Sequence, residues 1–316
     1  NNHIGLPLTI LKLKDHTAMV VEMGMNSLGE ISVLSNIAKP TISVITNVGT
    51  AHIGILGSRE NILKAKLEIL DGMSKDGTLV INNDNDMLNN WNKNNNTYNV
   101  ATFGINNDSD VMAKDIKFEE YSTEFLTITK NEELNVKVPL GGEHFLYNAL
   151  CSIVVGKLLN IDNKEILKGI EEFELTKNRM EIKKNKNNVT IINDCYNANY
   201  DSMKASLEYL SKSKLKRKIA VLGDMLELGE YSKQLHEKVG VEVAKNKIDI
   251  LITVGKEAKN ILNKAISMGM EKENAYNFET NEQAIELLNK ILKPEDIVLV
   301  KASNGMHFNK IIEKII

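Results

Sequence analysis

Three side chains near the start of the chain have the chemistry to bind a metal ion and a phosphate. Glu22 follows the apolar run Ala18–Val21, His52 follows Asn47-Val-Gly-Thr-Ala, and Lys66 comes soon afterwards on a predicted helix. A carboxylate at a strand end suits Mg²⁺, and a neutral imidazole can ligate a metal or hydrogen-bond a phosphate. Taken singly, each residue is also explained as a strand-end carboxylate, a structural histidine or a solvated helical lysine. Their convergence on one loop-and-helix system predicts a cation and phosphate site.

The elements that must position these residues alternate between strands and a helix. Ala18–Gly24, Ile42–Val48 and Thr78–Asn82 are predicted strands, and Ser58–Asp71 is a predicted helix. This alternation is typical of α/β folds, in which the carboxyl ends of parallel strands form ligand sites. We therefore expect the metal-site candidates at one edge of a mostly parallel sheet.

The remainder of the first half changes character. Asn89–Asn99 is rich in asparagine, which favours turns, and is predicted to be a surface loop. Phe125–Thr129 and Leu134–Val138 alternate around a charged turn, which predicts antiparallel hairpins at the sheet edge. Gly141-Gly142 then introduces a helix that ends near Leu159.

A second α/β domain is predicted after a boundary near Thr176, which gives domains 1–176 and 177–316. The Lys- and Asn-rich segment Ile182–Asn188 has no apolar periodicity and is expected to be irregular. Apolar strands and helical stretches then alternate in a Rossmann-like open sheet. The predicted strands are Val189–Asn193, Lys218–Leu222, Ile248–Val254 and Ile297–Lys301, and the helices are Ser202–Ser211, Ser232–Asn246 and Asn281–Leu292. No G-x-G-x-x-G follows the first strand, so dinucleotide binding is not supported.

The bulk composition is that of an ordinary globular protein. The 316 residues are 42% hydrophobic and carry a net charge of -3, which gives no general attraction to nucleic acid or anionic lipid. Only Cys151 and Cys195 are present, without metal-ligand spacing, so we expect a reducing cytoplasm and no structural zinc. No apolar run approaches the roughly 20 residues that span a bilayer. The sequence begins at Asn1, and we expect the natural N-terminus to lie upstream.

Further polar groups lie where ligands commonly bind. Asn148 is in the predicted helix after Gly142, whose opening amides can meet a ligand or simply be capped. Arg179 lies at the domain junction, where its guanidinium could reach phosphate oxygens or remain a surface charge. Asp194 opens a polar run that ends at Ser202, and Asx turns with a Ser or Asp N-cap also explain that run.

The motifs V-V-E-M-G, T-N-V-G-T-A-H and A-K-L-E together resemble the Mur ligase family, ATP-dependent amide-forming enzymes of peptidoglycan assembly. The resemblance implies an ATPase-type central domain followed by the Rossmann-like domain. It implies that Glu22 and His52 hold Mg²⁺ and that Lys66 is carbamylated to become an anionic ligand. The chemistry is consistent, because an ammonium has no acceptor whereas a carbamate supplies oxygen ligands.

The same resemblance implies a nucleotide site. The opening Asn1–Thr9 resembles the segment after the family's phosphate loop, which puts Asn2 near magnesium and the γ-phosphate. Asn148 corresponds to an adenine contact, Arg179 to a phosphate contact and Asp194 to a ribose contact. Phe145 replaces a more usual asparagine, although an aromatic ring could still pack on a base.

The pattern Y-N-A-N-x-D-S resembles the family branch that adds D-alanyl-D-alanine to UDP-N-acetylmuramoyl-tripeptide. Val221–Gly229 and Leu299–Met306 support the same branch. By resemblance both segments border the incoming dipeptide. The candidate dipeptide-binding residues are Asn197, Asn199, Lys301 and Ser303.

Several positions depart from the family pattern or have no predicted role. Tyr200 replaces a proline, and Ala302 and Asn304 replace the Gly and Arg of K-G-S-R-G. His236 and His307 have no convincing partner in the sequence and are expected to be structural or surface residues.

No G-x-x-x-x-G-K-[ST] phosphate loop occurs in the sequence. By resemblance that loop and the domain for the UDP end of the acceptor lie upstream, so we expect this chain to fold without ligating by itself. The expected partners are ATP, D-alanyl-D-alanine and UDP-N-acetylmuramoyl-tripeptide, and the expected state is a cytoplasmic monomer. Two alternatives stay open: a non-catalytic nucleotide- or dipeptide-binding fragment, and another Mur-type or folylpolyglutamate-type ligase.

Overall fold

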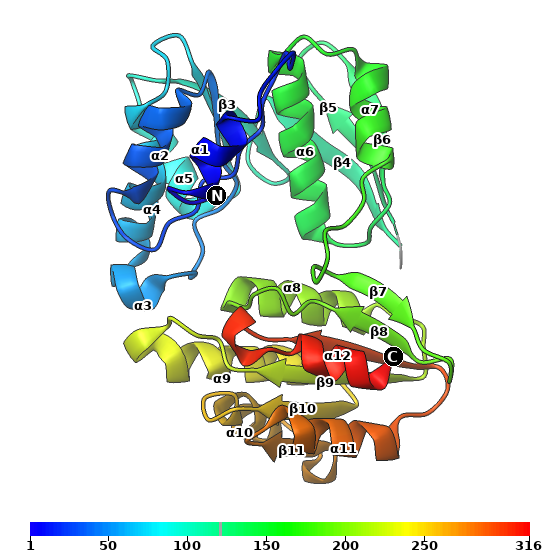
Figure 1. The fold of residues 1–316 in the computed structure, drawn as a ribbon. Helices are drawn as coiled ribbons and strands as arrows, with labels where there is room; N and C mark the ends of the chain where they lie inside the picture. Colours follow the sequence, from blue (N-terminus) through cyan, green and yellow to red (C-terminus); the bar gives the residue numbers. More distant parts are fainter. Residues whose placement is uncertain (120–121) are drawn as a thin grey trace. The chain divides into compact units, whose positions relative to one another are not determined.

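The computed structural model describes residues 1–119 and 122–316 and divides into two compact units, Asn1–Phe173 and Glu174–Ile316 (Figure 1). Each unit contains one six-stranded sheet with helices packed on it. The predicted boundary residue Thr176 lies in the irregular segment between the last helix of the first unit and the first strand of the second.

The sheet of the first unit is parallel on one side and antiparallel on the other. Its strands stand in chain order, so that each strand pairs with the next. The first four are mutually parallel and the last two pairings are antiparallel, which confirms the predicted mostly parallel sheet with edge hairpins. The strands are β1 (Ile42–Ile45), β2 (Thr78–Asn82), β3 (Asn99–Gly104), β4 (Val111–Phe118), β5 (Thr123–Ile128) and β6 (Glu133–Val138).

Helix α6 (Glu143–Leu158) is the main cover of this sheet. It packs on β2 through β6 and buries an apolar face that includes Leu146, Leu150 and Ile153. Helix α4 (Arg59–Leu67) begins after Ser58, whose hydroxyl accepts a bond from the Asn61 amide, as expected for an N-cap. The other helices are α1 (Gly5–Ile10), α2 (Glu30–Ala38), α3 (Ile53–Leu56), η1 (Glu68–Asp71), α5 (Asp86–Lys93) and α7 (Asn163–Glu171).

Two predictions for this unit were wrong. Ala18–Gly24 forms no strand, and Val20 is 92% exposed. A strand needs a neighbour for its backbone groups, and β1 has its sheet partner only on the β2 side. Asn89–Asn99 is not all loop, because α5 occupies its first part. The Asn85 side chain caps that helix, and the buried Leu88 fixes it to the core.

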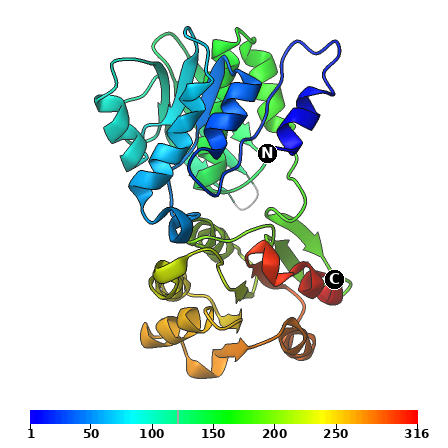
Figure 2. The same cartoon turned by 60° about the vertical axis from the view of Figure 1, so that its left-hand side comes forward.

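The second unit is an open, doubly wound sheet. The strand order is β11-β10-β9-β12-β8-β7, and every pairing is parallel except that of β7 with β8. Helices α8, α9 and α10 cover one face and α11 and α12 the other, as Figure 2 shows. This confirms the Rossmann-like prediction. The elements are β7 (Glu181–Lys184), β8 (Thr190–Asn193), α8 (Tyr200–Ser211), β9 (Arg217–Gly223), η2 (Gly229–Tyr231), α9 (Ser232–Lys245), β10 (Ile250–Val254), α10 (Lys259–Ser267), η3 (Lys272–Asn274), β11 (Ala275–Phe278), α11 (Asn281–Ile291), β12 (Asp296–Lys301), η4 (Asn304–Met306) and α12 (Asn309–Ile315).

The two edge strands of this sheet were missed from the sequence. The segment Ile182–Asn188, expected to be irregular, contains most of β7, which alternates half-buried and exposed residues against β8. Strand β11 is half-buried throughout. Edge strands bury less apolar surface than central ones, so their sequences carry a weaker hydrophobic signal.

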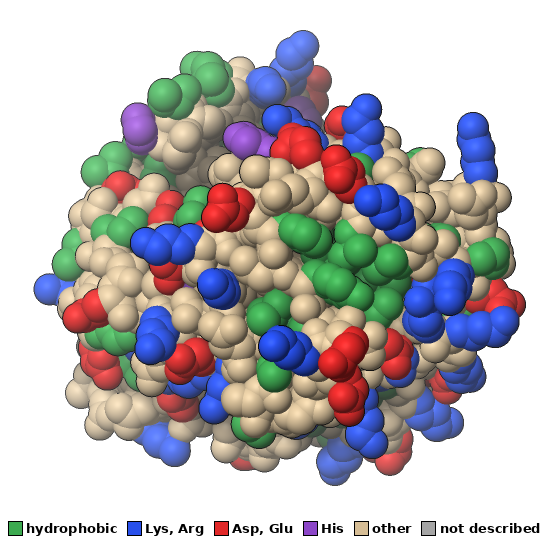
Figure 3. Space-filling model, turned by 90° about the horizontal axis from the view of Figure 1, so that it is seen from below, with side chains coloured by type: hydrophobic (Ala, Val, Ile, Leu, Met, Phe, Trp, Pro, Cys, Tyr) green, Lys and Arg blue, Asp and Glu red, His purple; other side chains and the backbone are tan. Residues whose placement is uncertain are grey.

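The face in Figure 3 carries Lys, Arg, Asp and Glu side chains interspersed around a patch of apolar ones. This mixture agrees with the small net charge and gives that face no field of a single sign. Within residues 1–119 and 122–316, no helix is long and apolar enough to cross a membrane.

Candidate functional site

The loop that carries His52 is tied to its surroundings by side chains of two helices. The Val48 carbonyl accepts bonds from Arg59 Nη2 at 2.8 Å and Asn85 Nδ2 at 3.3 Å. Arg59 also forms a bidentate pair with Asp86, at 2.8 and 2.5 Å. His52 is half-buried at φ 62° and is the N-cap residue directly before α3. The histidine therefore stands in a constrained loop rather than a free one.

Lys66 lies in the last turn of α4 and is half-buried, whereas Lys64 on the same helix is exposed. Burial lowers the pKa of Lys66, because an ammonium loses hydration there. Glu68, two residues further on, accepts the Gly29 amide at 2.7 and 2.9 Å and thereby joins η1 to the start of α2. Within the A-K-L-E motif, the Lys66 amine is therefore desolvated, whereas the Glu68 carboxylate has a structural role.

Glu22 and Asn2 lie in the N-terminal segment. The exposed Glu22 carboxylate accepts a bond from the Asn1 side chain at 3.3 Å. Asn2 Oδ1 accepts the amides of Ile4 and Gly5, at 3.1 and 2.8 Å, at the start of α1. Asn2 also lines a cavity of about 340 Å³ with His3, Gly24, Leu28, Gly29, Glu30, Val33 and Leu34.

Across the described part of the chain, no three His, Cys, Asp or Glu side chains form a group that could hold a metal ion. A magnesium ion bound by Glu22 and His52 would take its remaining ligands from water, phosphate or another side chain. An unmodified lysine cannot serve, since its ammonium has no acceptor, whereas a carbamate at Lys66 would supply oxygen ligands.

The N-terminal half of α6 is anchored by an aspartate that lies far away in the sequence. Asp84 accepts the amides of residues 105–107 and the Tyr147 hydroxyl, the latter at 2.9 Å. Burial alone would raise the pKa of Asp84, but these bonds to its ionised form lower it. Burial and the same contact raise the pKa of Tyr147. The next residue, Asn148, is exposed on this fixed helix.

Phe145 does not have the role that the sequence left open for it. Its side chain is only 8% exposed, and its ring lies 4.0 Å from that of His144. The idea that this aromatic ring packs on a base was wrong, because the helix turns it into the core. The Asn148 side chain remains the exposed candidate on this part of α6.

Arg179 and Tyr196 form a stacked pair in the second unit. The Arg179 guanidinium lies 4.1 Å from the centroid of the Tyr196 ring, which is a cation–π contact. The Tyr196 amide donates to the Asn178 carbonyl at 3.0 Å. Both side chains are exposed, so this contact orients Arg179 while leaving it accessible.

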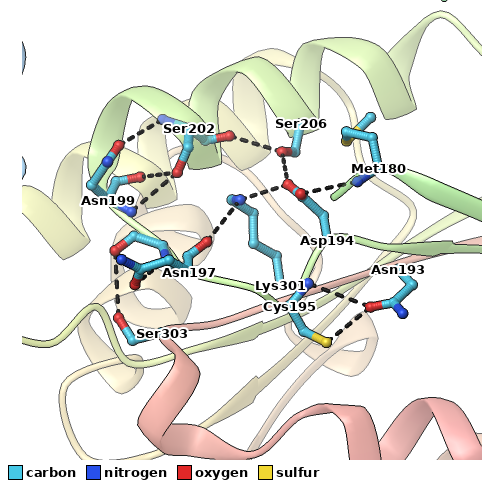
Figure 4. A network of polar contacts seen from close by, with 11 residues as sticks. Met180, Asn193, Asp194, Cys195, Asn197, Asn199, Ser202, Ser206, Lys301 and Ser303 are labelled. Carbon is cyan, nitrogen blue, oxygen red and sulfur yellow. Dashed lines mark hydrogen bonds and ion pairs between the residues drawn. The ribbon is translucent and has the colours of Figure 1, made fainter. Parts of the chain in front are cut away.

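Asp194 and Lys301 form a buried ion pair (Figure 4). Lys301 Nζ donates to Asp194 Oδ2 at 2.5 Å, and Lys301 is 2% exposed. The same carboxylate oxygen accepts the Ser206 hydroxyl at 2.7 Å, and Oδ1 accepts the Met180 amide at 3.1 Å. Two residues predicted to bind different ligands are therefore partners of each other.

The other residues predicted for the dipeptide site adjoin this pair. The Asn197 carbonyl accepts Lys301 Nζ at 3.1 Å. Ser303 Oγ donates to the Ala198 carbonyl at 3.4 Å and accepts the Leu226 amide at 2.9 Å. The structure thus brings Asp194, Asn197, Lys301 and Ser303 together in one polar network (Figure 4).

Asn199 has a structural role at the start of α8. Its side chain accepts the Ser202 amide at 2.9 Å, while Ser202 Oγ accepts the Asn199 amide at 3.1 Å. This is a capping box. The sequence correctly indicated a cap here but assigned it to Ser or Asp rather than to Asn199.

His236 is fully buried and has two hydrogen-bond partners. His236 Nε2 accepts the Met225 amide at 3.0 Å, and Nδ1 donates to the Ser232 carbonyl at 2.7 Å. His236 is a structural residue, as expected, although the sequence did not identify these two partners. Nearby, Asp224 accepts the Ala258 amide at 2.7 Å. The sequence feature that could have identified Asp224 as a candidate is its position directly after strand β9, in the motif G-D-M.

Comparison with known proteins covers both units. Residues 1–156 match the Mur ligase middle domain, and residues 178–304 match the Mur ligase, glutamate ligase domain. A relative from Bacillus subtilis (strain 168), named UDP-N-acetylmuramoyl-tripeptide--D-alanyl-D-alanine ligase, is 36% identical over 318 residues. That match covers 100% of this chain and 68% of the relative.

Solved structures agree with the sequence comparison. Crystal structure I of MurF from Acinetobacter baumannii superposes with a TM-score of 0.91 at 29% identity, covering 100% of this chain and 68% of that one. MurF ligase from Thermotoga maritima, solved in complex with ADP, gives a TM-score of 0.85 at 28% identity and covers 100% and 71%.

Two successive α/β units with these matches define a Mur ligase, and the chain belongs to the Mur ligase family. Members of this family are ATP-dependent ligases that form amide bonds, which confirms the resemblance recognised in the sequence motifs. The particular ligase that it resembles, in sequence and in structure, is the D-alanyl-D-alanine-adding enzyme MurF.

Proposed function

We propose that this chain binds ATP with Mg²⁺ and D-alanyl-D-alanine, and serves in joining that dipeptide to UDP-N-acetylmuramoyl-tripeptide. The observation that carries the proposal is the 36% identity, along the whole chain, to a relative with that name. A related structure solved with ADP supports the nucleotide part. We also propose that the protein is cytoplasmic and monomeric. The two free, buried cysteines are consistent with a reducing compartment.

We assign magnesium to Glu22, His52 and a carbamylated Lys66. A carboxylate has about four lone-pair sites, so the bond from the Asn1 side chain leaves Glu22 free to bind a cation. Burial favours the neutral Lys66 amine, which can add CO₂ to give a carbamate and release one proton. When bound, Mg²⁺ would offset negative charge on the transferring phosphoryl group.

We assign the nucleotide to Asn2, Asn148, Arg179 and Asp194. Asn148 and Arg179 are exposed, so the side chain of each is accessible to a ligand. Asp194 is mostly bonded within the protein, but its Oδ1 accepts one amide and retains a lone pair for a ribose hydroxyl. Asn2 is exposed as well, and its Oδ1 is already engaged at the start of α1, so its amide group is the part left for phosphate.

We assign the dipeptide to the polar network of the second unit. The network lies after β8 and β12, at the carboxyl ends of two parallel strands, where open α/β sheets bind ligands. Asn197 is exposed and can contact the dipeptide directly, while Asn199, Lys301 and Ser303 border the same site.

Isothermal titration of the purified chain with ATP–Mg²⁺ and with D-alanyl-D-alanine tests the function. We expect both to bind, and we expect L-alanyl-L-alanine, the matched control, to bind much more weakly. Binding of neither ligand would support a structural fragment instead. Preference for a single amino acid over the dipeptide would indicate another Mur-type or folylpolyglutamate-type ligase.

The lysine modification has its own test. In the presence of ¹³C-bicarbonate, the chain should show a carbamate carbon by NMR, because the half-buried Lys66 amine is neutral more often than an ordinary lysine. Lys66→Met should abolish the signal, whereas Lys64→Met, which changes an exposed lysine on the same helix, should retain it. A signal that survives Lys66→Met would refute the assignment.

A further inference from the structure

The loop Cys195–Asn199, between β8 and α8, is bonded to its surroundings along its backbone. Four of its residues, from Tyr196 to Asn199, engage a main-chain amide or carbonyl in the contacts already described. The Ala198 amide additionally donates to the Asn197 side chain at 2.8 Å. A loop with so many bonds is held in one shape, and we call it the 195–199 loop.

Lys301 contacts the middle of this loop through its ammonium, as Figure 4 shows. Its ammonium lies between Asp194 Oδ2 and the Asn197 carbonyl, at 2.5 and 3.1 Å. With 2% of the residue exposed, no surface remains for direct contact with a dipeptide. A buried ammonium is tolerated only when it is paired, so Lys301 depends on Asp194 to remain there.

Asp194 connects the pair to two other elements. Its Oδ1 binds the amide of Met180, which adjoins the exposed Arg179, and its Oδ2 binds Ser206 on α8. The carboxylate therefore links three parts of the unit: the residue directly before β7, helix α8 and the last residue of β12. Loss of its charge partner would loosen contacts on both sides of the 195–199 loop.

The loop exposes two side chains, Tyr196 and Asn197, while Cys195 and Ala198 are buried. Tyr196 is 44% exposed and carries the Arg179 guanidinium on its ring. The loop stands where β12 separates β8 from β9, which makes it the topological switch point of the sheet. A dipeptide bound at this edge meets Tyr196 and Asn197 and not the buried Lys301 ammonium.

We propose that Lys301 and Asp194 are positioning residues of the ligase. Their buried ion pair fixes the 195–199 loop, through the Asn197 carbonyl, in the shape that presents Tyr196 and Asn197 to the amine substrate. The inference rests on the proposed function for the identity of that substrate. It changes the role of Lys301, which acts on the dipeptide through the loop instead of touching it.

A second ion pair in the same sheet, whose carboxylate is buried, provides a control. Arg217 and Asp296 pair at 2.8 and 2.6 Å, and Asp296 is 1% exposed. They stand at the first residues of β9 and β12, whereas Lys301 is the last residue of β12. Arg217→Met therefore removes the cationic partner of a buried carboxylate at the opposite ends of these strands.

The test compares Lys301→Met with Arg217→Met by hydrogen–deuterium exchange and by titration with D-alanyl-D-alanine. Lys301→Met should raise exchange in the 195–199 loop while the central strands stay protected, and should weaken dipeptide binding at least tenfold. Arg217→Met should leave both readouts at the wild-type level. Wild-type loop protection and affinity in Lys301→Met, or equal losses in Arg217→Met, would overturn the proposal.

A double variant covers the case in which Lys301→Met does not fold. Asp194→Asn combined with Lys301→Met removes both buried charges and keeps an acceptor for the Met180 amide. It should fold and still show the loop exchange and the weaker dipeptide binding, and wild-type values in it would contradict the proposal. If the wild-type chain itself binds no dipeptide, the proposed function fails, while the loop exchange still decides whether the pair fixes the loop.

Discussion

The buried His236 should make the second unit less stable in mild acid. The ring is fully buried and uses both nitrogens, Nε2 as an acceptor and Nδ1 as a donor. Protonation would place a second N–H against the Met225 amide. Desolvation lowers the pKa of His236, although the Ser232 carbonyl and the carboxylates of Asp224 and Glu257 act in the opposite direction.

The sign and size follow from proton linkage. A histidine in the unfolded chain has a pKa of about 6.5, so the unfolded state binds more protons than the folded state below that pH. The contribution of His236 is therefore present above pH 6.5 and is lost as the pH falls. Between pH 7.5 and 5.5 the loss reaches at most about 1.4 kcal/mol, which corresponds to a urea midpoint lower by roughly 0.5–1.4 M.

Urea denaturation at the two pH values measures this effect. Circular dichroism reports both units, whereas Trp91, the single tryptophan, lies in α5 and reports the first unit. His236→Gln keeps one donor and one acceptor but does not titrate, so its second-unit midpoint should move less with pH than that of the wild type. His307→Asn is the control, because His307 is exposed and asparagine tolerates its φ of 53°. Equal pH shifts in the wild type and His236→Gln would refute the reasoning.

Two further predictions concern packing and thiol burial. Gly72→Ala should destabilise the first unit by about 3 kcal/mol, because its Cβ would lie 2.1 Å from the backbone of Ser35. The matched Gly169→Ala, in an open helical position, should stabilise that unit by about 0.5–1 kcal/mol, and tryptophan fluorescence in urea measures both. Burial raises the pKa of Cys151 and Cys195 to about 11, so neither thiol should react with Ellman's reagent at pH 8 until urea unfolds its unit. Rapid labelling of either native thiol would contradict the described burial.

Central strands could be predicted from the sequence because burial on both faces leaves a continuous apolar run. Thr78–Asn82 has the same bounds in the prediction and in the structure, and nearly all of it is buried. The rule fails where an apolar run has no neighbour to pair with, as in Ala18–Gly24. It also fails where a strand is half-covered, as in β7 and β11. Strand pairing is a tertiary property, and a local pattern reports only the burial that accompanies it.

Capping residues explain why the asparagine-rich segment was misread. Asparagine favours turns, and composition alone therefore predicted a loop over Asn89–Asn99. A single side chain, that of Asn85, accepts the Leu88 amide and starts a helix before that segment. One cap and one buried leucine outweigh the turn preference of several exposed asparagines, and counting residue types does not register this.

The candidate site shows the same limit at the level of single side chains. Motif matching selected Asp194, Asn197, Lys301 and Ser303, and the structure does bring these four together. Motif matching could not distinguish a side chain that contacts a ligand from one that positions the ligand-binding loop. The two kinds of side chain differ in burial and not in residue type. Lys301 is hydrophilic in the sequence yet 2% exposed, since its charge is met by a carboxylate 107 residues away. Among these four residues, Asn197 is the exposed one, and a ligand that depends on this motif is therefore recognised through a loop whose shape the buried residues set.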